Sequence, residues 1–294
     1  MELEDRYFDS AGVPIRYVEA GRGEPLLLLH GFSSSLDEGW VERGVVADLA
    51  DRWRVVAFDA RGHGRSGKPH DPAAYGPEMG LDALRLMDHL GLGRAHLMGY
   101  SMGAHVAAHL AVHRPERLHS LVLGGAVGRL DWSPADQARV DAEAAELDLG
   151  LLSSQILRLW PKDQPPPSEE ELRAISARRL AGKDPLALAA VRRSNPRQVV
   201  TLDRMASIRL PVLGIVGTAD PYARDFERVR AVLPAMRVVT IPGAAHGNAV
   251  GRPEYVAAVR AFLAAHPMEE NEEPREYASP ACSLHELDPA FRSE

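Results

Sequence analysis

Ser101 is the residue whose surroundings point most directly to chemistry. It stands in the segment Gly99-Tyr100-Ser101-Met102-Gly103, which follows a short apolar run and precedes a stretch of helical periodicity. A sharp turn from strand to helix needs little bulk two residues before and two residues after it, and Gly99 and Gly103 meet that condition. Such a turn lifts the hydroxyl clear of a sheet and aims the first N–H groups of the helix at it. The segment predicts a nucleophilic serine, with the Met102 N–H as a donor to a developing oxyanion.

The elements that must hold this turn alternate along the chain. Short apolar runs with the length of buried strands are separated by segments of helical periodicity, which predicts a parallel sheet with helices on both faces. Ligands of such sheets bind beyond the carboxyl ends of the strands. The predicted strands are Leu26 to Leu29, Val55 to Phe58, Ala95 to Met98, Leu118 to Leu123, Val212 to Val216 and Arg237 to Ile241, preceded by a hairpin over Arg6 to Ala20.

The alternation stops after Ala126 and resumes at Pro211. The interval contains helix-like pieces, and a structureless loop of that length is uncommon in a compact domain. We therefore predict a helical cap over residues 127–205, inserted into a core domain of residues 1–126 and 206–267. Residues 268–294 are acidic and lack periodicity, which predicts a disordered tail.

Charge and composition limit the possible partners. Of the formal net charge of −7, the tail from Met268 carries −6, which leaves −1 for the rest of the chain. A nearly neutral body without a basic stripe gives no support for nucleic-acid binding. No apolar run approaches the eighteen residues that suggest a membrane span, and the acidic start lacks the features of a secretory signal. The single cysteine, Cys282, cannot form an internal disulfide, and a cytoplasmic protein is expected.

Together, the motifs resemble the α/β-hydrolase fold family over residues 6–265. This resemblance implies a mostly parallel eight-stranded sheet flanked by helices, with an inserted helical cap. His30-Gly31-Phe32, after the first parallel strand, resembles the oxyanion loop of the family and implies the Phe32 N–H as the second oxyanion donor. The segment from Asp59 to Ser66 resembles a loop that the family uses more for structure than for chemistry. We expect His30 and His63 to brace their loops.

The same resemblance assigns the acid and the base. Asp220 and His246 follow two predicted strands at the family's acid and histidine positions, and the chain order serine, acid, histidine is the one expected of the fold. His105, one helical turn beyond the serine, is an alternative base, although packing is its expected use. Asp131 is an alternative acid. Asp220 could instead cap the helix that begins near Tyr222.

The reaction implied is hydrolysis of a small-molecule carboxylic ester of small to medium acyl chain through an acyl-enzyme, as in carboxylesterases. His246 would take the Ser101 proton, Asp220 would stabilise the imidazolium, and the N–H groups of Phe32 and Met102 would hold the oxyanion. This chemistry needs no organic cofactor and no metal, and the sequence shows no metal-ligand spacing. The oligomeric state is left open.

Serine at position 101 disfavours two activities of the family, because members that open epoxides or remove halide place an aspartate there. Carbon–carbon bond hydrolases and enol-lactonases use the same triad and stay open as alternatives. A ligand receptor or carrier without hydrolysis is a further alternative, although all three triad positions are filled.

Substrate choice is expected to depend on the cap. Trp132 and Trp160, together with Tyr100 beside the nucleophile, are the predicted substrate contacts, although apolar residues at helical spacing more often pack internally. The cap arginines, including Arg192 and Arg193, are candidates for binding a substrate carboxylate. A solvated helix face is the alternative interpretation of these arginines.

Overall fold

The computed structural model describes residues 3–161 and 164–268. Within them the strands form one eight-stranded sheet in the order β1-β2-β4-β3-β5-β6-β7-β8. The pairs β1–β2 and β2–β4 are antiparallel, and the other neighbouring pairs are parallel, so the predicted mostly parallel sheet is confirmed. The strands are β1 (Arg6–Ser10), β2 (Val13–Ala20), β3 (Glu24–Leu29), β4 (Trp53–Phe58), β5 (Ala95–Tyr100), β6 (Leu118–Gly124), β7 (Val212–Gly217) and β8 (Arg237–Ile241).

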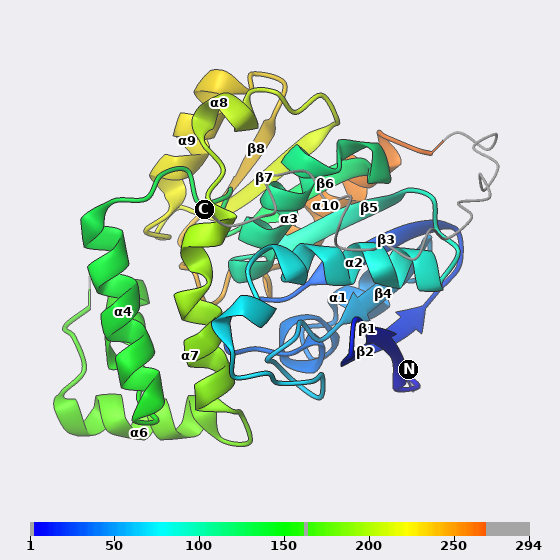
Figure 1. Ribbon diagram of the computed structural model, residues 1–294. Helices are drawn as coiled ribbons and strands as arrows, with labels where there is room; N and C mark the ends of the chain where they lie inside the picture. The colour runs from blue at the N-terminus through cyan, green and yellow to red at the C-terminus, as the bar shows by residue number, and fades with distance from the viewer. Residues whose placement is uncertain (1–2, 162–163, 269–294) are drawn as a thin grey trace.

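Helices cover both faces of the sheet (Figure 1). Because successive side chains of a strand point to opposite faces, Leu27 and Leu29 enter one apolar cluster while Leu26 and Leu28 enter the other. The first cluster includes residues of α2 (Pro77–His89), α3 (Met102–His113), α8 (Leu202–Met205) and α9 (Ala223–Val232), and the second includes residues of α1 (Val45–Leu49) and α10 (Pro253–Ala264). The sheet is therefore buried on both sides, as the continuous apolar runs predict.

Between β6 and β7 the chain forms a group of helices beside the sheet, with α4 and α7 next to each other at the left of Figure 1. Their apolar side chains form a separate, smaller cluster that includes Leu147, Ile156 and Leu188. These helices lie inside the interval 127–205 that was predicted as a cap, and the division into core and cap stays a prediction. The helices are α4 (Pro134–Asp148), α5 (Ser153–Leu159), α6 (Glu169–Leu180) and α7 (Pro185–Arg193).

Short helical turns complete the fold at η1 (Asp37–Val41), η2 (Pro72–Ala74), η3 (Pro115–Arg117) and η4 (Asn195–Gln198). None of the helices in the described residues has the length and apolar character needed to cross a membrane. Apart from Met268, the predicted acidic tail lies outside the described residues. The parallel strands β3 to β8 all end at the same edge of the sheet, and the loops that follow them carry the residues considered next.

Candidate active site

Ser101 occupies the sharp turn between β5 and α3 in a strained backbone conformation, with φ 54° and ψ −110°. A Cβ atom on Gly99 would come within 2.2 Å of the Gly103 carbonyl oxygen, and one on Gly103 would come within 2.1 Å of the Leu29 carbonyl oxygen. The Ser101 N–H donates to the Gly124 carbonyl at 2.8 Å. The turn is thus held by backbone contacts that leave no room for a side chain at either glycine.

The structure brings Ser101, His246 and Asp220 together in one chain of hydrogen bonds. Nε2 of His246 lies 2.8 Å from Oγ of Ser101, and Nδ1 lies 2.8 Å from Oδ2 of Asp220. A carboxylate only accepts hydrogen bonds, so Nδ1 carries the ring proton and Nε2 presents its lone pair to the serine hydroxyl. The Asp220 side chain is fully buried and the His246 side chain is 7% exposed, which keeps this pair away from bulk water.

Three hydrogen bonds fix the loops that carry the acid and the histidine. The Tyr100 hydroxyl donates to the His246 carbonyl at 2.5 Å, and the Asn248 side-chain oxygen accepts from the Ala245 N–H at 2.9 Å. Burial raises the pKa of Tyr100, which keeps its hydroxyl a donor. Oδ1 of Asp220 accepts the Tyr222 N–H at 3.0 Å, at the start of α9. The carboxylate therefore orients the imidazole and also fixes the residue just before α9, but it does not cap that helix, whose N-cap residue is Tyr222.

The loop after β3 lies against the serine turn. A Cβ atom on Gly31 would sit 3.6 Å from Cβ of Ser101, which shows how closely the two segments approach. Phe32 and Met102 both line the cavity above the serine. In the described part of the chain, neither of their N–H groups has a hydrogen-bond acceptor. Two free backbone donors beside one nucleophile are the arrangement that an oxyanion requires.

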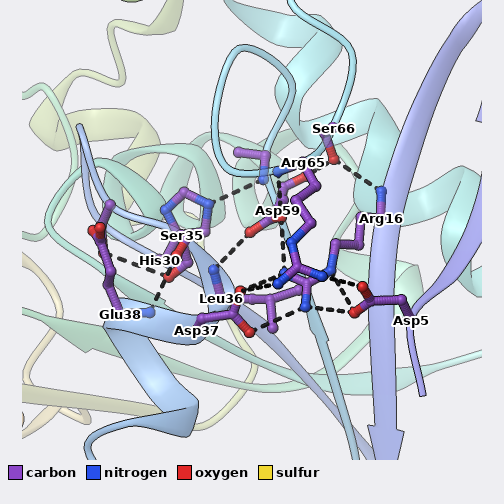
Figure 2. Close-up of polar contacts among 12 residues, drawn as sticks. Asp5, Arg16, His30, Ser35, Leu36, Asp37, Glu38, Asp59, Arg65 and Ser66 are labelled. Carbon is purple, nitrogen blue, oxygen red and sulfur yellow. Dashed lines mark hydrogen bonds and ion pairs between the residues drawn. The ribbon is translucent and has the colours of Figure 1, made fainter. Parts of the chain in front are cut away.

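Asp59 holds this loop in place from the end of β4. Its carboxylate accepts hydrogen bonds from the Leu36 N–H at 2.7 Å, the Arg65 N–H at 2.8 Å and the Arg16 guanidinium at 3.2 Å (Figure 2). Arg16 in turn contacts Asp37, 2.7 Å away. The loops after β3 and β4 are therefore tied together through one buried carboxylate.

His30 makes a second tie between the same two loops. Its Nε2 accepts the Ala60 N–H at 3.1 Å and its Nδ1 donates to the Gly31 carbonyl at 2.8 Å. Burial lowers the pKa of His30 and of His63, so both rings are held neutral. The His63 ring packs edge-on against His30 and Phe32. Both histidines thus have the bracing geometry expected for them.

The two rival residues lie away from the hydrogen-bonded chain. His105 is half-buried in α3, where its Nδ1 has no hydrogen-bond partner among the described residues and its ring packs edge-on against Tyr222. The Asp131 side chain is 68% exposed and pairs with Arg228 at 2.8 Å. The backbone N–H of His105 donates to the Ser101 carbonyl at 3.1 Å, and both rival residues line the cavity, but neither side chain hydrogen-bonds to Ser101 or His246.

A cavity of about 490 Å³ lies over the serine, between the strand-end loops and the helices of the interval 127–205. Of the predicted substrate contacts, Tyr100 and Trp132 line it. Trp160 does not, because its indole N–H donates to the Pro165 carbonyl at 3.0 Å and its ring packs with the smaller apolar cluster. The structure therefore does not bring Trp160 to the candidate site.

Sequence reasoning missed Tyr222, which lines the same cavity. The centroid of its ring is 5.4 Å from that of His246, and its hydroxyl accepts a hydrogen bond from Arg158. The available signal was its position two residues after Asp220, on a loop that leaves the same edge of the sheet. The described residues contain no group of three or more His, Cys, Asp or Glu side chains that could hold a metal ion.

Comparison with known proteins agrees with this geometry. The haloalkane dehalogenase 2 of Mycobacterium tuberculosis is 30% identical over 277 residues, which cover 87% of this chain and 93% of that protein. An acetyltransferase component of the acetoin cleaving system from Cupriavidus necator is 36% identical over 165 residues, which are 52% of this chain but only 43% of that longer protein. A solved hydrolase from Pseudomonas aeruginosa superposes with a TM-score of 0.72 at 28% identity, covering 88% of this chain and 98% of that one.

The sequence model of the alpha/beta hydrolase fold matches residues 24–250, which span β3 to the loop that carries His246. This match includes the strand-to-helix turn at Ser101, the Asp220 loop and the helices between β6 and β7. Since it covers well over half of the chain and agrees with the sheet order, the chain belongs to the alpha/beta hydrolase fold family.

Proposed function

We propose that this protein hydrolyses carboxylic esters through an acyl-enzyme, with Ser101 as nucleophile, His246 as base and Asp220 as the carboxylate behind it. The observation that carries the proposal is the chain of two 2.8 Å hydrogen bonds that joins the three side chains under a cavity. The strained serine turn and the free N–H groups of Phe32 and Met102 support it.

In the first half of the reaction, Oγ of Ser101 bonds to the ester carbonyl carbon while its proton moves to Nε2 of His246. The buried Asp220 carboxylate stabilises the imidazolium that results. The carbonyl oxygen gains negative charge between the N–H groups of Phe32 and Met102, and each such donor is worth roughly 10²–10³ in rate. When the tetrahedral intermediate collapses, the C–O bond breaks and the alcohol leaves with the proton from Nε2.

In the second half, a water molecule gives a proton to Nε2 of His246 and attacks the acyl carbon. The same two N–H groups hold the second oxyanion, and the Ser101 oxygen leaves with the proton from the imidazolium. The balance is one ester and one water consumed, with one acid and one alcohol formed. No other reactant is required.

Two alternatives use the same side chains or the same cavity. Enol-lactonases and carbon–carbon bond hydrolases share the triad, so lactones and vinylogous diketones belong in the substrate panel. Dehalogenation, which is the activity named for the Mycobacterium relative, is disfavoured because Ser101 stands where the resemblance expects an aspartate. A carrier without hydrolysis would bind such compounds without turnover.

The experiment compares p-nitrophenyl butyrate turnover by the wild type and by Ser101→Ala, at equal concentrations of purified and folded protein. We expect turnover by the wild type and a loss of on the order of 10⁴-fold or more in the variant, since the nucleophile is gone. No turnover of any ester by the wild type, or equal turnover by both proteins, would overturn the proposal.

A further inference from the structure

Outside the triad, Arg129 is the residue whose surroundings indicate most clearly that it binds a ligand. It follows β6, lines the cavity above Ser101, and has its backbone fixed because its carbonyl accepts the Val200 N–H at 2.8 Å. In the described part of the chain its guanidinium has no acidic partner, and its Nε is buried without a hydrogen-bond acceptor. Burial, together with the nearby Arg192, lowers the pKa of Arg129, so its charged form is destabilised until an anion approaches.

The neighbouring charges do not supply that anion. Arg158 and Arg192 also line the cavity, and each forms an ion pair with the buried Glu143, at 2.9 Å and 3.2 Å. The Arg192 contact lacks hydrogen-bond geometry, and its guanidinium donates to the Gln155 side-chain oxygen instead. One carboxylate therefore faces three guanidinium groups, since Arg139 lies 3.8 Å from Glu143 as well, while Arg129 adds a further positive charge. An isolated cation in a site of reduced dielectric is costly unless a partner binds it.

Other charged pairs of the cavity wall are complete without Arg129. Lys183 contacts Glu38 at 2.8 Å, Arg139 contacts Asp136 at 2.9 Å, and Arg228 contacts Asp131 at 2.8 Å. Arg43, Arg178 and Arg179 also line the cavity, and among the described residues none of them forms an ion pair with a carboxylate, so the wall as a whole is positively charged. Arg129 differs from these three because its buried Nε has no hydrogen-bond acceptor. A neutral ester would leave this positive charge uncompensated.

The position of Arg129 fits a second group on the same substrate. His105, one helical turn beyond Ser101, lines the same cavity as Arg129 and His246. A cavity of about 490 Å³ can hold a molecule that spans the serine and the arginine. Guanidinium is planar and matches a carboxylate with two parallel hydrogen bonds.

We infer that the substrate carries a free carboxylate besides its scissile bond, and that Arg129 binds this carboxylate in the cavity above Ser101. The inference rests on the proposed ester hydrolysis for its kinetic test, but its binding test does not need turnover. Arg129 then acts as a specificity residue, because it selects half-esters of dicarboxylic acids over neutral esters of the same length.

The kinetic test uses matched pairs of esters. Monomethyl succinate, glutarate and adipate are compared with methyl esters of the same chain length in which a methyl group replaces the carboxylate. We expect the wild type to prefer at least one half-ester in kcat/KM by roughly ten- to a hundredfold, which is the worth of a hydrogen bond to a charged group. Equal kcat/KM for every pair would overturn the inference without any variant being made.

Two variants assign the preference to one side chain. Arg129→Gln should abolish the ratio of half-ester to methyl-ester turnover, and Arg129→Lys should restore part of it through charge alone. Arg193→Gln is the matched control, because Arg193 pairs with Asp148 on the surface and does not line the cavity. A ratio that Arg129→Gln leaves unchanged would contradict the assignment.

A binding test separates failure of this inference from failure of the proposed function. Monomethyl glutarate is titrated calorimetrically into Ser101→Ala and into Ser101→Ala/Arg129→Gln. Binding to the first protein and at least tenfold weaker binding to the second supports the anion subsite even if no ester is turned over. Turnover of neutral esters with equal binding to both proteins would retain the esterase and overturn the subsite.

Discussion

The wall of the cavity formed by the strand ends and the wall formed by α4, α5 and α7 are held by different forces. The first rests on backbone contacts so close that Gly99 and Gly103 cannot carry a side chain, with two large apolar clusters behind it. The second has one small apolar cluster and depends on ion pairs around the buried Glu143. Backbone contacts allow almost no substitution, whereas long charged side chains can be exchanged one at a time. We therefore expect the strand-end wall to determine the proposed chemistry and the helical wall to determine the choice of substrate.

The largest effect on activity is expected from removing the acid of the strand-end wall, and this variant tests the difference between the two walls. Asp220→Asn should lower kcat by about 10⁴-fold, as expected when the imidazole is no longer held in its productive tautomer. The measurement is ester turnover with unfolding controls. Asp131→Asn is the matched variant, because Asp131 lines the same cavity but is exposed and pairs with Arg228 rather than with the imidazole, and it should stay within about twofold of the wild type. Equal losses in the two variants would mean that the acid is misassigned.

The next effect tests whether backbone contact holds the serine turn. In Gly103→Ala the new Cβ would meet the Leu29 carbonyl oxygen at 2.1 Å, so the free energy of unfolding should fall by about 3 kcal/mol or more. Gly93→Ala is the control, since a Cβ there would meet nothing within 4 Å. Urea unfolding measures both variants. If Gly103→Ala were as stable as Gly93→Ala, the argument from close packing would fail.

On the helical wall, Glu143→Gln should have a smaller effect. Burial raises the pKa of Glu143, but Arg192 and Arg158 more than offset this and hold it below its ordinary value, so the group is charged at neutral pH. Its removal leaves two guanidinium groups without a counter-charge and should cost about 2 kcal/mol, less than a fully buried pair because Arg158 is partly exposed. Asp148→Asn, in the exposed pair with Arg193, should cost about 0.5 kcal/mol. Equal losses of stability in the two variants would show that Glu143 contributes no more than an exposed carboxylate.

The smallest expected effect is a change of stability with pH, which arises from His96 in the interior of the sheet. Burial lowers the pKa of His96 to about 4, so the folded protein keeps this ring neutral while the unfolded chain protonates it near pH 6.5. The unfolded state therefore binds more protons between these values, and stability falls as the pH drops from 6.5 toward 4. Replacing His96 by Gln removes this contribution, which is about 1 to 2 kcal/mol at pH 5.5.

Urea unfolding of the wild type and His96→Gln at pH 7.5 and pH 5.5 measures that contribution. The stability difference between the two proteins should shrink at the lower pH. A difference that does not change with pH would show that the ring is not kept neutral in the folded protein, whatever the overall cost of the substitution.

The sequence was sufficient to predict those elements whose causes are local. The strand at 237–241 has the predicted bounds, because an apolar run acts over a few neighbouring positions. The serine turn and the loops of Asp220 and His246 could be predicted for the same reason. Each is a short motif directly after a strand.

The lining of the cavity could not be predicted in the same way. Trp160 and Trp132 both lie in the interval 127–205, yet only Trp132 reaches the cavity, since the direction of a side chain depends on which helix packs against which. Tyr222 and Arg129 were missed for a related reason. That Arg129 lacks an acidic partner is a property of its surroundings in three dimensions, which no spacing along the chain encodes.

Phe32 contacts both walls of the cavity. Its ring packs against the large cluster under α3 and against the small cluster of the helices, and the Arg192 guanidinium lies 3.8 Å from the ring centroid. We therefore expect a ligand that moves Arg192 to move Phe32 as well, whose N–H is the proposed oxyanion donor. In that case, substrate groups that bind far from Ser101 would affect kcat as well as binding. Shortened substrates would then show a lower kcat and not only a higher KM.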